Sequence, residues 1–294
     1  MKDRIKDPIH ISSVPSYLWD SNMIFHYTKT DTAIAHILFK NQLRLNRRMN
    51  ASDPMEKLYH PLNTNHLNRP NDSAESIKKG EVLSDYKRDL NHSLEMANQL
   101  SFCLNNNTLP DLKYADDLGF LKFRMWDQYA AQFHGVCLCF DQDILLASVK
   151  HTELSDSLNH PTKFTSGEVD YKHLLEFGIK EDESQSNNLE GILKKKLFTK
   201  QRSYEDEKEL RLLNFNERGE YYLPFTKEAL KAIFYFTHKA SGLKKKHHFL
   251  NDFQRHKILE YAKTNQVDVF ELEIQGYYQE VMISRLHNGK NEVK

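Results

Sequence analysis

The chain has 294 residues, enough to bury a sizeable core in one large domain or two small ones. Lys and Arg together number 41, and so do Asp and Glu, so no long-range field is expected to gather nucleic acid or an anionic membrane. No stretch approaches the ~20 apolar residues that a membrane helix requires, and the N-terminus lacks an apolar signal segment. We therefore expect a cytoplasmic protein with no membrane partner.

The first half of the chain is predicted to alternate strands and helices, because apolar residues recur there at the spacings of both. The expected elements are a strand at residues 23 to 28, a helix capped by Thr30 or Asp31 that ends near 38, a strand at 40 to 45, a polar excursion at 51 to 80, a helix at 81 to 98 and a strand at 99 to 104.

The second half is predicted to be richer in strands. Leu121, Met125, Tyr129 and Phe133 recur every four residues, which predicts an amphipathic helix at 120 to 133. The further elements are strands at 135 to 141, 166 to 171, 209 to 215, 220 to 225, 232 to 237, 267 to 274 and 280 to 286, an interrupted helix at 172 to 200, and helices near 226 to 232 and 247 to 264. The pattern predicts one α+β domain over residues 1 to 294, with a mixed or mostly antiparallel sheet decorated with helices.

Three cysteines occur, and two of them, Cys137 and Cys139, are one residue apart in a predicted strand. This spacing puts both thiols on one face and disfavours a bridge between them. The paired Cys or His spacing of a zinc site is absent from the sequence. We expect buried thiols in a reducing compartment, and we predict no metal site.

The stretch "SYEDEKEL", residues 203 to 210, places four carboxylates in five positions just before an apolar run. If a strand begins near Glu207, alternation puts Glu207, Glu209 and Arg211 on one face, and Leu210 and Leu212 on the other face, toward the core. The guanidinium would keep the carboxylates ionised. A solvated charged face is the default interpretation of such a pattern, and the rim of an active site is the competing one.

Two aromatic segments carry further candidates. His26 shares a strand face with Thr28, opposite Phe25 and Tyr27, although a lone strand histidine is usually a satisfied core residue. Trp126 and Tyr129 are three apart on the predicted helix, a spacing that more often marks core packing than a stacking platform.

Polar segments carry weaker candidates. The turn at residues 50 to 57 holds Asp53 and Glu56, which face either a site or the solvent. The lysine runs at 194 to 196 and 244 to 248 are candidate phosphate-binding patches, but solvated faces are the preferred interpretation. The sequence lacks a Walker loop, a Gly-x-Gly-x-x-Gly loop, a His-Glu-x-x-His motif and a Gly-x-Ser-x-Gly motif, which argues against the enzyme classes that these define.

Six segments occur in an order typical of one family: "FHYTKTDTAIAHILFKNQLRL", "NASDPMEK", "LSFC", "MWDQYAAQFHGVCLCFD", "VDY" and "KQRSYEDEKELRLL". Over residues 24 to 213 or so, the chain resembles a bacterial domain-of-unknown-function family with an aromatic-His-Tyr opening, an Asn-Asp-Pro-x-Glu turn, a Trp-x-x-Tyr-Ala helix and a Trp-x-x-Glu-x-Glu-x-Arg close. Ser52 and Tyr204 depart from that pattern, where the family has Asn and Trp.

The layout is, more distantly, similar to ADP-ribosyltransferases of the His-Tyr-Glu type. That similarity implies NAD as a substrate and a catalytic glutamate on a late strand, which matches Glu207 or Glu209. It also implies an early-strand histidine at the nicotinamide ribose, which matches His26 with its neighbours Tyr27 and Thr28. Tyr129 is the candidate for stacking on the nicotinamide, and Arg211 or a lysine is the candidate for the pyrophosphate.

Three functions stay open from the sequence. The first is an NAD-dependent ADP-ribosyltransferase-like enzyme in stress or phage defence, with a nucleotide, a nucleic acid or a protein as the acceptor. The second is a Mg²⁺-dependent nuclease that uses Asp53, Glu56, Glu207 and Glu209 as a carboxylate cluster. The third is a non-catalytic module that senses a nucleotide or binds another protein.

Overall fold

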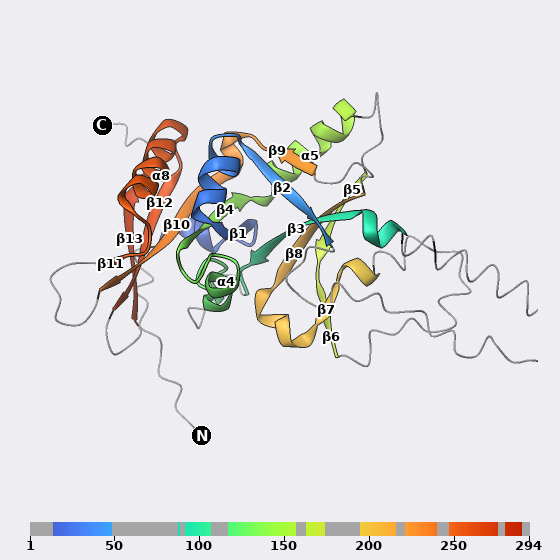
Figure 1. Cartoon of the computed structure of the whole chain (residues 1–294), viewed down its shortest axis with the longest axis horizontal. Helices are drawn as coiled ribbons and strands as arrows, with labels where there is room; N and C mark the ends of the chain where they lie inside the picture. The colour runs from blue at the N-terminus through green and yellow to red at the C-terminus, as the bar shows by residue number, and fades with distance from the viewer. Residues whose placement is uncertain are drawn as a thin grey trace, which may run out of the picture.

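The computed structural model confirms the α+β class (Figure 1). It describes residues 14 to 48, 88, 92 to 106, 117 to 156, 163 to 173, 195 to 215, 221 to 239, 247 to 275 and 280 to 289. Within these residues, eleven strands form one sheet, and β6 (Asp170–Lys172) and β7 (Thr199–Gln201) form a separate parallel pair. That the whole chain forms a single domain stays a prediction.

One half of the large sheet consists of five neighbouring strands. Their order is β13 (Glu280–His287), β12 (Asp268–Gln275), β10 (Leu230–Lys239), β4 (Gly135–Asp141) and β1 (Met23–Lys29), and the short β11 (His247–His248) also pairs with β10. Strands β10 and β12 are parallel, with α8 (Asp252–Asn265) between them in the chain, and the other neighbours are antiparallel. The sheet was predicted to be mixed or mostly antiparallel, and it is mixed, with a single parallel pair among these strands.

The sheet splits at β3 (Ala97–Leu104). One edge of β3 pairs with β8 (Glu209–Phe215) over seven positions, and β8 in turn pairs with β5 (Lys163–Glu168). The other edge is shared: β1 pairs only at Cys103 and Leu104, and β2 (Gln42–Arg47) pairs only at Asn98 and Gln99. Strand β9 (Tyr221–Pro224) then extends the sheet beyond β2. The strands β1 and β2 therefore separate from each other around Ser101.

Helices cover both faces of this sheet. On one face lie the π-helix η3 (Ala33–Leu38), which continues α1 (Thr30–Thr32), and the helices α5 (Gln142–Asp156) and α8; η3, α5 and α8 share one apolar core. On the other face, η2 (Ser16–Trp19) and α4 (Phe123–Gln128) pack in a second core rich in aromatic side chains. In this core Tyr27 meets the ring of Trp126 edge-on, which confirms core packing as the role of Trp126.

The predicted helix at 120 to 133 is too long. The helix α4 ends at Gln128, and Ala131, Gln132 and Phe133 have φ angles of 49°, 53° and 69°. Three successive left-handed residues reverse the chain before β4, a conformation that costs each non-glycine residue about 1 kcal/mol or more. A four-residue apolar repeat cannot reveal such a turn. Tyr129 and Phe133 pack against the core here, as they would if the helix continued to residue 133.

Other boundaries also differ from the predictions. Thr30 does not cap its helix; its hydroxyl donates to the carbonyl oxygen of His134 at 2.6 Å. The helix expected near 226 to 232 is only a turn, η8 (Lys227–Ala229), because β10 begins at Leu230. The helix α5 was not predicted, whereas α8 was, and Asn251 and Gln254 begin α8 with a reciprocal capping box.

Several predicted segments lie partly or wholly outside the described residues. These are the polar excursion with Asp53 and Glu56, most of the helix at 81 to 98, most of the interrupted helix at 172 to 200, and residues 244 to 246 of the second lysine run. Strand β3 begins at Ala97, so the helix predicted to end at 98 ends earlier.

All three cysteines are buried and free, as predicted. Burial raises the pKa of each thiol, and Cys137 and Cys139 pack on the same side of β4 in the aromatic core. Across the described ranges, none of the helices combines the length and the apolar character needed to cross a membrane.

Candidate functional site

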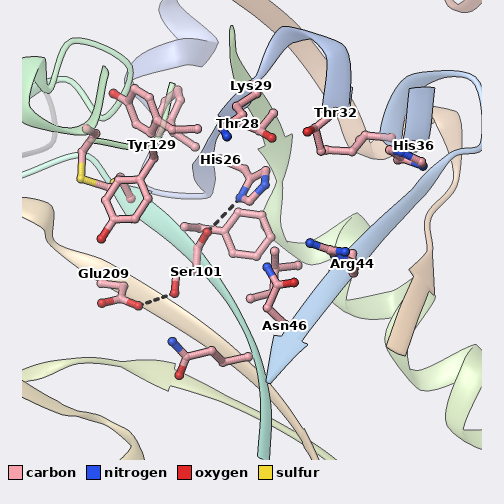
Figure 2. Close-up of a pocket in the computed structure, with 18 of the residues that line it drawn as sticks. His26, Thr28, Lys29, Thr32, His36, Arg44, Asn46, Ser101, Tyr129 and Glu209 are labelled. Carbon is pink, nitrogen blue, oxygen red and sulfur yellow. Dashed lines mark hydrogen bonds between the residues drawn. The ribbon is translucent and has the colours of Figure 1, made fainter. Parts of the chain in front are cut away.

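A cavity of about 510 Å³ lies where β1 and β2 separate. Strands β1, β2 and β3 line it together with η3, and Tyr129, Lys200, Glu207 and Glu209 close one side. Its volume is within the range of protein pockets that enclose whole small-molecule ligands. Figure 2 shows His26 in the middle of the lining, with Tyr129 and Arg44 on opposite sides of it in this view.

His26 bonds the backbone of β3 beside the split. Its Nδ1 lies 3.1 Å from the carbonyl oxygen of Ser101, a residue for which neither β1 nor β2 provides a ladder partner (Figure 2). A carbonyl oxygen only accepts hydrogen bonds, so Nδ1 carries the proton. Burial lowers the pKa of His26 below its ordinary value, which makes the ring neutral at pH 7 and leaves Nε2 as an acceptor.

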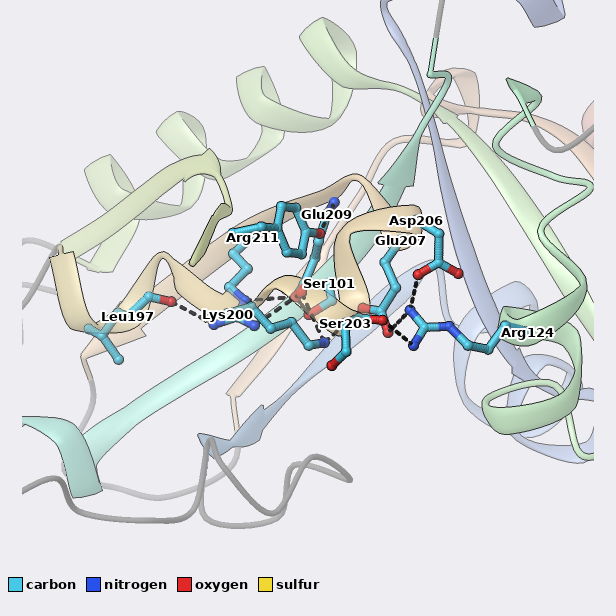
Figure 3. A network of polar contacts seen from close by, with 10 residues as sticks. Ser101, Arg124, Leu197, Lys200, Ser203, Asp206, Glu207, Glu209 and Arg211 are labelled. Carbon is cyan, nitrogen blue, oxygen red and sulfur yellow. Dashed lines mark hydrogen bonds and ion pairs between the residues drawn. The ribbon is translucent and has the colours of Figure 1, made fainter. Parts of the chain in front are cut away.

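Two buried carboxylates meet one lysine beside the cavity. The ammonium of Lys200 lies 2.7 Å from Glu207 and 3.3 Å from Glu209 (Figure 3). Glu207 ends the short helix η7 (Arg202–Glu207), and the left-handed Lys208, with φ 45°, turns the chain so that Glu209 begins β8. This turn allows carboxylates from two different elements to converge on the same cation.

Glu209 is fully engaged by its neighbours. Arg211 donates to both of its oxygens, from Nε at 2.7 Å and from Nη2 at 3.0 Å, and the Ser101 hydroxyl is a further donor (Figure 3). Burial alone would raise the pKa of Glu209, but Arg211 and Lys200, with the hydrogen bonds, outweigh it and hold that pKa well below its ordinary range. Glu209 is therefore ionised and held in place.

Glu207 has a different environment. Lys200 and Arg124 each contact one of its oxygens, at 2.7 Å and 3.1 Å, yet desolvation dominates and raises its pKa. Arg124 also pairs with Asp206 at 2.5 Å, and the Lys122 ammonium donates to the Asp206 carbonyl oxygen at 2.7 Å. These two bonds attach the end of η7 to the α4 segment and so fix the position of Glu207.

The default interpretation of the acidic stretch, a solvated face, is wrong for its second half. Glu207, Glu209 and Arg211 are only 1%, 3% and 0% exposed, whereas Glu205 and Asp206 are exposed. Glu209 and Arg211 share a strand face, as alternation predicts, but Glu207 lies before the strand. Tyr204, where the family pattern has Trp, presents its ring to Lys200 and Arg124 at 4.8 Å and 4.9 Å.

The other predicted site residues fall into two groups. His26, Thr28 and Tyr129 line the cavity, and Tyr129 does so from the turn that follows α4. Tyr27 also borders it, but its hydroxyl donates to the Gly119 carbonyl oxygen at 2.6 Å, so this side chain is anchored in the aromatic core. Arg211 is not among the lining residues; its Nη1 donates to the Leu197 carbonyl oxygen at 2.6 Å behind the cavity.

The far side of the cavity is basic. Exposed or half-buried cationic side chains from β1 and β2 line it: Lys29, Arg44 and Arg47, with His36 of η3 nearby. Lys195 and Lys196 of the first predicted phosphate-binding run do not belong to this lining. The cavity therefore has a carboxylate side, next to β8, and a cationic side, next to β2.

Most residues of the carboxylate network lie in a segment that matches a known sequence family. A domain of unknown function, DUF2971, is found at residues 125–212. The match includes Tyr129, Lys200, Glu207, Glu209 and Arg211, but it leaves out His26 and the strands β2 and β3. It confirms the predicted resemblance to a domain of unknown function for this part, and the similarity over residues 24 to 124 stays a prediction.

No curated protein matches the chain, and no solved structure matches it. The more distant similarity to ADP-ribosyltransferases thus has no support from these comparisons.

Sequence reasoning missed the side chains that hold the carboxylates. Lys200, Ser101 and Arg124 come from β7, β3 and α4, and only the folded chain brings them to Glu207 and Glu209. Arg44 was also missed. The alternating pattern of β2, with Leu43 and Leu45 inward, was the available signal that Arg44 faces outward.

Proposed function

We propose that the chain cleaves the bond between nicotinamide and ribose in NAD and transfers ADP-ribose to a nucleophilic acceptor. The observation that carries this proposal is the polarity of the cavity at the β1/β2 split. Two buried carboxylates that share Lys200 lie on one side, a neutral histidine lies at the centre, and cations lie on the other side, where the described lining residues include no carboxylate. NAD has the matching polarity, with a cationic nicotinamide ring at one end and an anionic pyrophosphate in the middle.

Glu207 suits the catalytic role better than Glu209. As the glycosidic bond breaks, nicotinamide leaves as a neutral molecule and C1′ of the ribose develops cationic character. A carboxylate beside C1′ stabilises that charge chiefly near the transition state, and it can take the proton of the acceptor as the new bond to C1′ forms. Glu209 already receives donors from Arg211, Lys200 and Ser101, so we assign it a positioning role.

His26 and Tyr129 suit the binding of the nicotinamide ribose. With its proton fixed on Nδ1, the ring of His26 offers Nε2 as an acceptor for a ribose hydroxyl. The half-buried Tyr129 supplies an aromatic ring at the carboxylate side of the cavity, where a flat cationic ring would stack favourably.

The nuclease alternative is not favoured by the geometry. Lys200 and Arg211 already neutralise Glu207 and Glu209, and a Mg²⁺ ion would have to compete with both cations for these oxygens. The other two carboxylates of that hypothesis, Asp53 and Glu56, lie outside the described residues.

The test is nicotinamide release from NAD by the full chain, with and without Mg²⁺ and with protein and nucleic-acid acceptors. Glu207→Gln keeps the shape of the side chain and removes its charge, and we expect it to reduce release by at least 100-fold. Glu205→Gln, in the same turn but exposed, is the matched control and should retain activity. Absence of both NAD binding and nicotinamide release in the wild type would refute the proposal. NAD binding without release would favour the nucleotide-sensing module.

A further inference from the structure

We propose that Arg44 and Tyr222 form a subsite for the adenylate half of the dinucleotide, on the outer face of β2 and β9. This inference rests on the proposed function, since it assumes that the nicotinamide half lies beside Glu207. Both side chains line the cavity on the side away from the two carboxylates. Neither was singled out by the sequence.

The register of β2 and β9 places the two side chains next to each other. Arg44 is directly opposite Tyr222 in this antiparallel pair. Opposite residues of an antiparallel pair project from the same face, with Cβ atoms about 5 Å apart. Burial alternates along β2, with Leu43 and Leu45 in the core and Arg44 exposed, so that face is the outer one. The pair thus presents a guanidinium and an aromatic ring side by side.

This pairing has the chemistry of a nucleotide site. Tyr222 is 41% exposed on the wall of the cavity, and its ring offers a platform for a purine base. The planar guanidinium of Arg44 can pair with two phosphate oxygens at once. Lys29 and Arg47 line the same cavity and add positive charge for a pyrophosphate.

The position of the carboxylates sets the direction of the ligand. Lys200 on the β8 side is already paired with Glu207 and Glu209, whereas Lys29, Arg44 and Arg47 line the cavity toward β2, so the pyrophosphate belongs on the β2 side and the nicotinamide on the β8 side. One ligand that spans the cavity would then contact Arg44 with its phosphates and reach Tyr222 with its adenine. A mononucleoside such as nicotinamide riboside fills only the carboxylate side.

The experiment is calorimetric titration of the full chain with NAD, ADP and nicotinamide riboside. Arg44→Gln and Tyr222→Leu should each weaken the binding of NAD and ADP about ten-fold, the loss of one charged hydrogen bond or one stacked base. Both variants should bind nicotinamide riboside as the wild type does. Lys40→Gln and Phe253→Leu, which change exposed residues outside the cavity lining, are the matched controls and should leave all three affinities unchanged.

The outcomes separate this inference from the proposed function. If ADP binding depends on Arg44 and Tyr222 but NAD is not cleaved, the subsite stands and the glycosidic reaction falls. If ADP does not bind the wild type, or binds both variants unchanged, the subsite is refuted. It is also refuted if single-stranded oligothymidine binds through Tyr222 while ADP binding does not depend on that residue, which would indicate a nucleic-acid site.

Discussion

The ammonium group of Lys200 lies 2.7 Å from Oε2 of Glu207, and both side chains are almost completely buried. The same ammonium also contacts Glu209, so two buried carboxylates share this cation, and Arg124 and Arg211 each pair with one of them. Removing one partner of a buried ion pair leaves the other charge uncompensated, which costs far more than the net contribution of the pair.

Replacing Lys200 by methionine should therefore lower the free energy of unfolding by about 3 to 5 kcal/mol. The measurement is urea denaturation at pH 7. Lys208→Met is the matched control, because Lys208 lies between the two glutamates in sequence but is exposed, and its replacement should cost less than about 0.5 kcal/mol. Equal losses in the two variants would contradict this account of the network.

Arg211→Lys should also be strongly destabilising, although it keeps the charge. The guanidinium donates to both oxygens of Glu209 and to the Leu197 carbonyl oxygen, and an ammonium cannot reproduce this planar arrangement. We expect a loss of about 3 kcal/mol, from hydrogen bonds to a charged group. Arg202→Lys, at an exposed ion pair, is the control and should change stability little. A similar, small effect of both substitutions would count against the role of Arg211.

Protonation of His26 should destabilise the fold below pH 6.5. The folded-state pKa is lowered by burial, so the unfolded chain binds more protons in this range, and the free energy of unfolding falls as the pH falls. His26→Asn keeps a donor for the Ser101 carbonyl oxygen but does not titrate. Melting temperatures of both proteins should be measured from pH 8 to pH 5. As the pH falls, the melting temperature of the wild type should decrease more than that of the variant. A difference in melting temperature that does not change with pH would contradict a lowered pKa of His26 in the folded state.

Gln132→Gly should stabilise the protein. Gln132 is exposed with φ 53°, and glycine adopts the left-handed region without steric cost. The gain should be about 0.5 to 1 kcal/mol, visible as a higher melting temperature by calorimetry. Gln128→Gly, at the end of α4, is the control and should lower the melting temperature, because glycine is unfavourable in a helix. A loss of stability in both variants would show that the left-handed turn is not strained.

The pH profile of nicotinamide release tests the assignment of the catalytic carboxylate. The pKa of Glu207 is raised above its ordinary value of 4.5 and that of Glu209 is lowered below it. If ionised Glu207 is required, activity should fall on the acid side at a pH above 4.5. An acid limb below 4.5 would assign the reaction to Glu209 instead.

Local patterns in the sequence predicted much of the fold but little of the site. Runs of strand-forming residues identified β1, β4 and β8, and alternation predicted that Glu209 and Arg211 share a face, because these features depend only on neighbours in the chain. It could not show that Glu207 is buried, since its burial depends on Lys200 and on the left-handed Lys208. Charged runs are expected to be solvated by default. That expectation fails here because Arg124, Lys200 and Arg211, from three separate elements, compensate the charges of the two buried glutamates.

The split of the sheet was equally beyond the sequence. Whether β3 is paired with β1 or β2 at a given residue depends on register, and nothing local to Ser101 distinguishes a ladder position from an open one. His26, which was singled out from the resemblance rather than from periodicity, lines the cavity, and its role in binding the nicotinamide ribose stays a prediction.

The burial of all three thiols has a practical consequence. Their raised pKa values and the packed side chains around them make Cys103, Cys137 and Cys139 poor nucleophiles toward maleimide reagents in the native state. A single cysteine introduced at the exposed position of Phe253 or Leu286 would then take up a fluorophore selectively. The chain is thus suited to distance measurements by fluorescence without prior removal of its own cysteines.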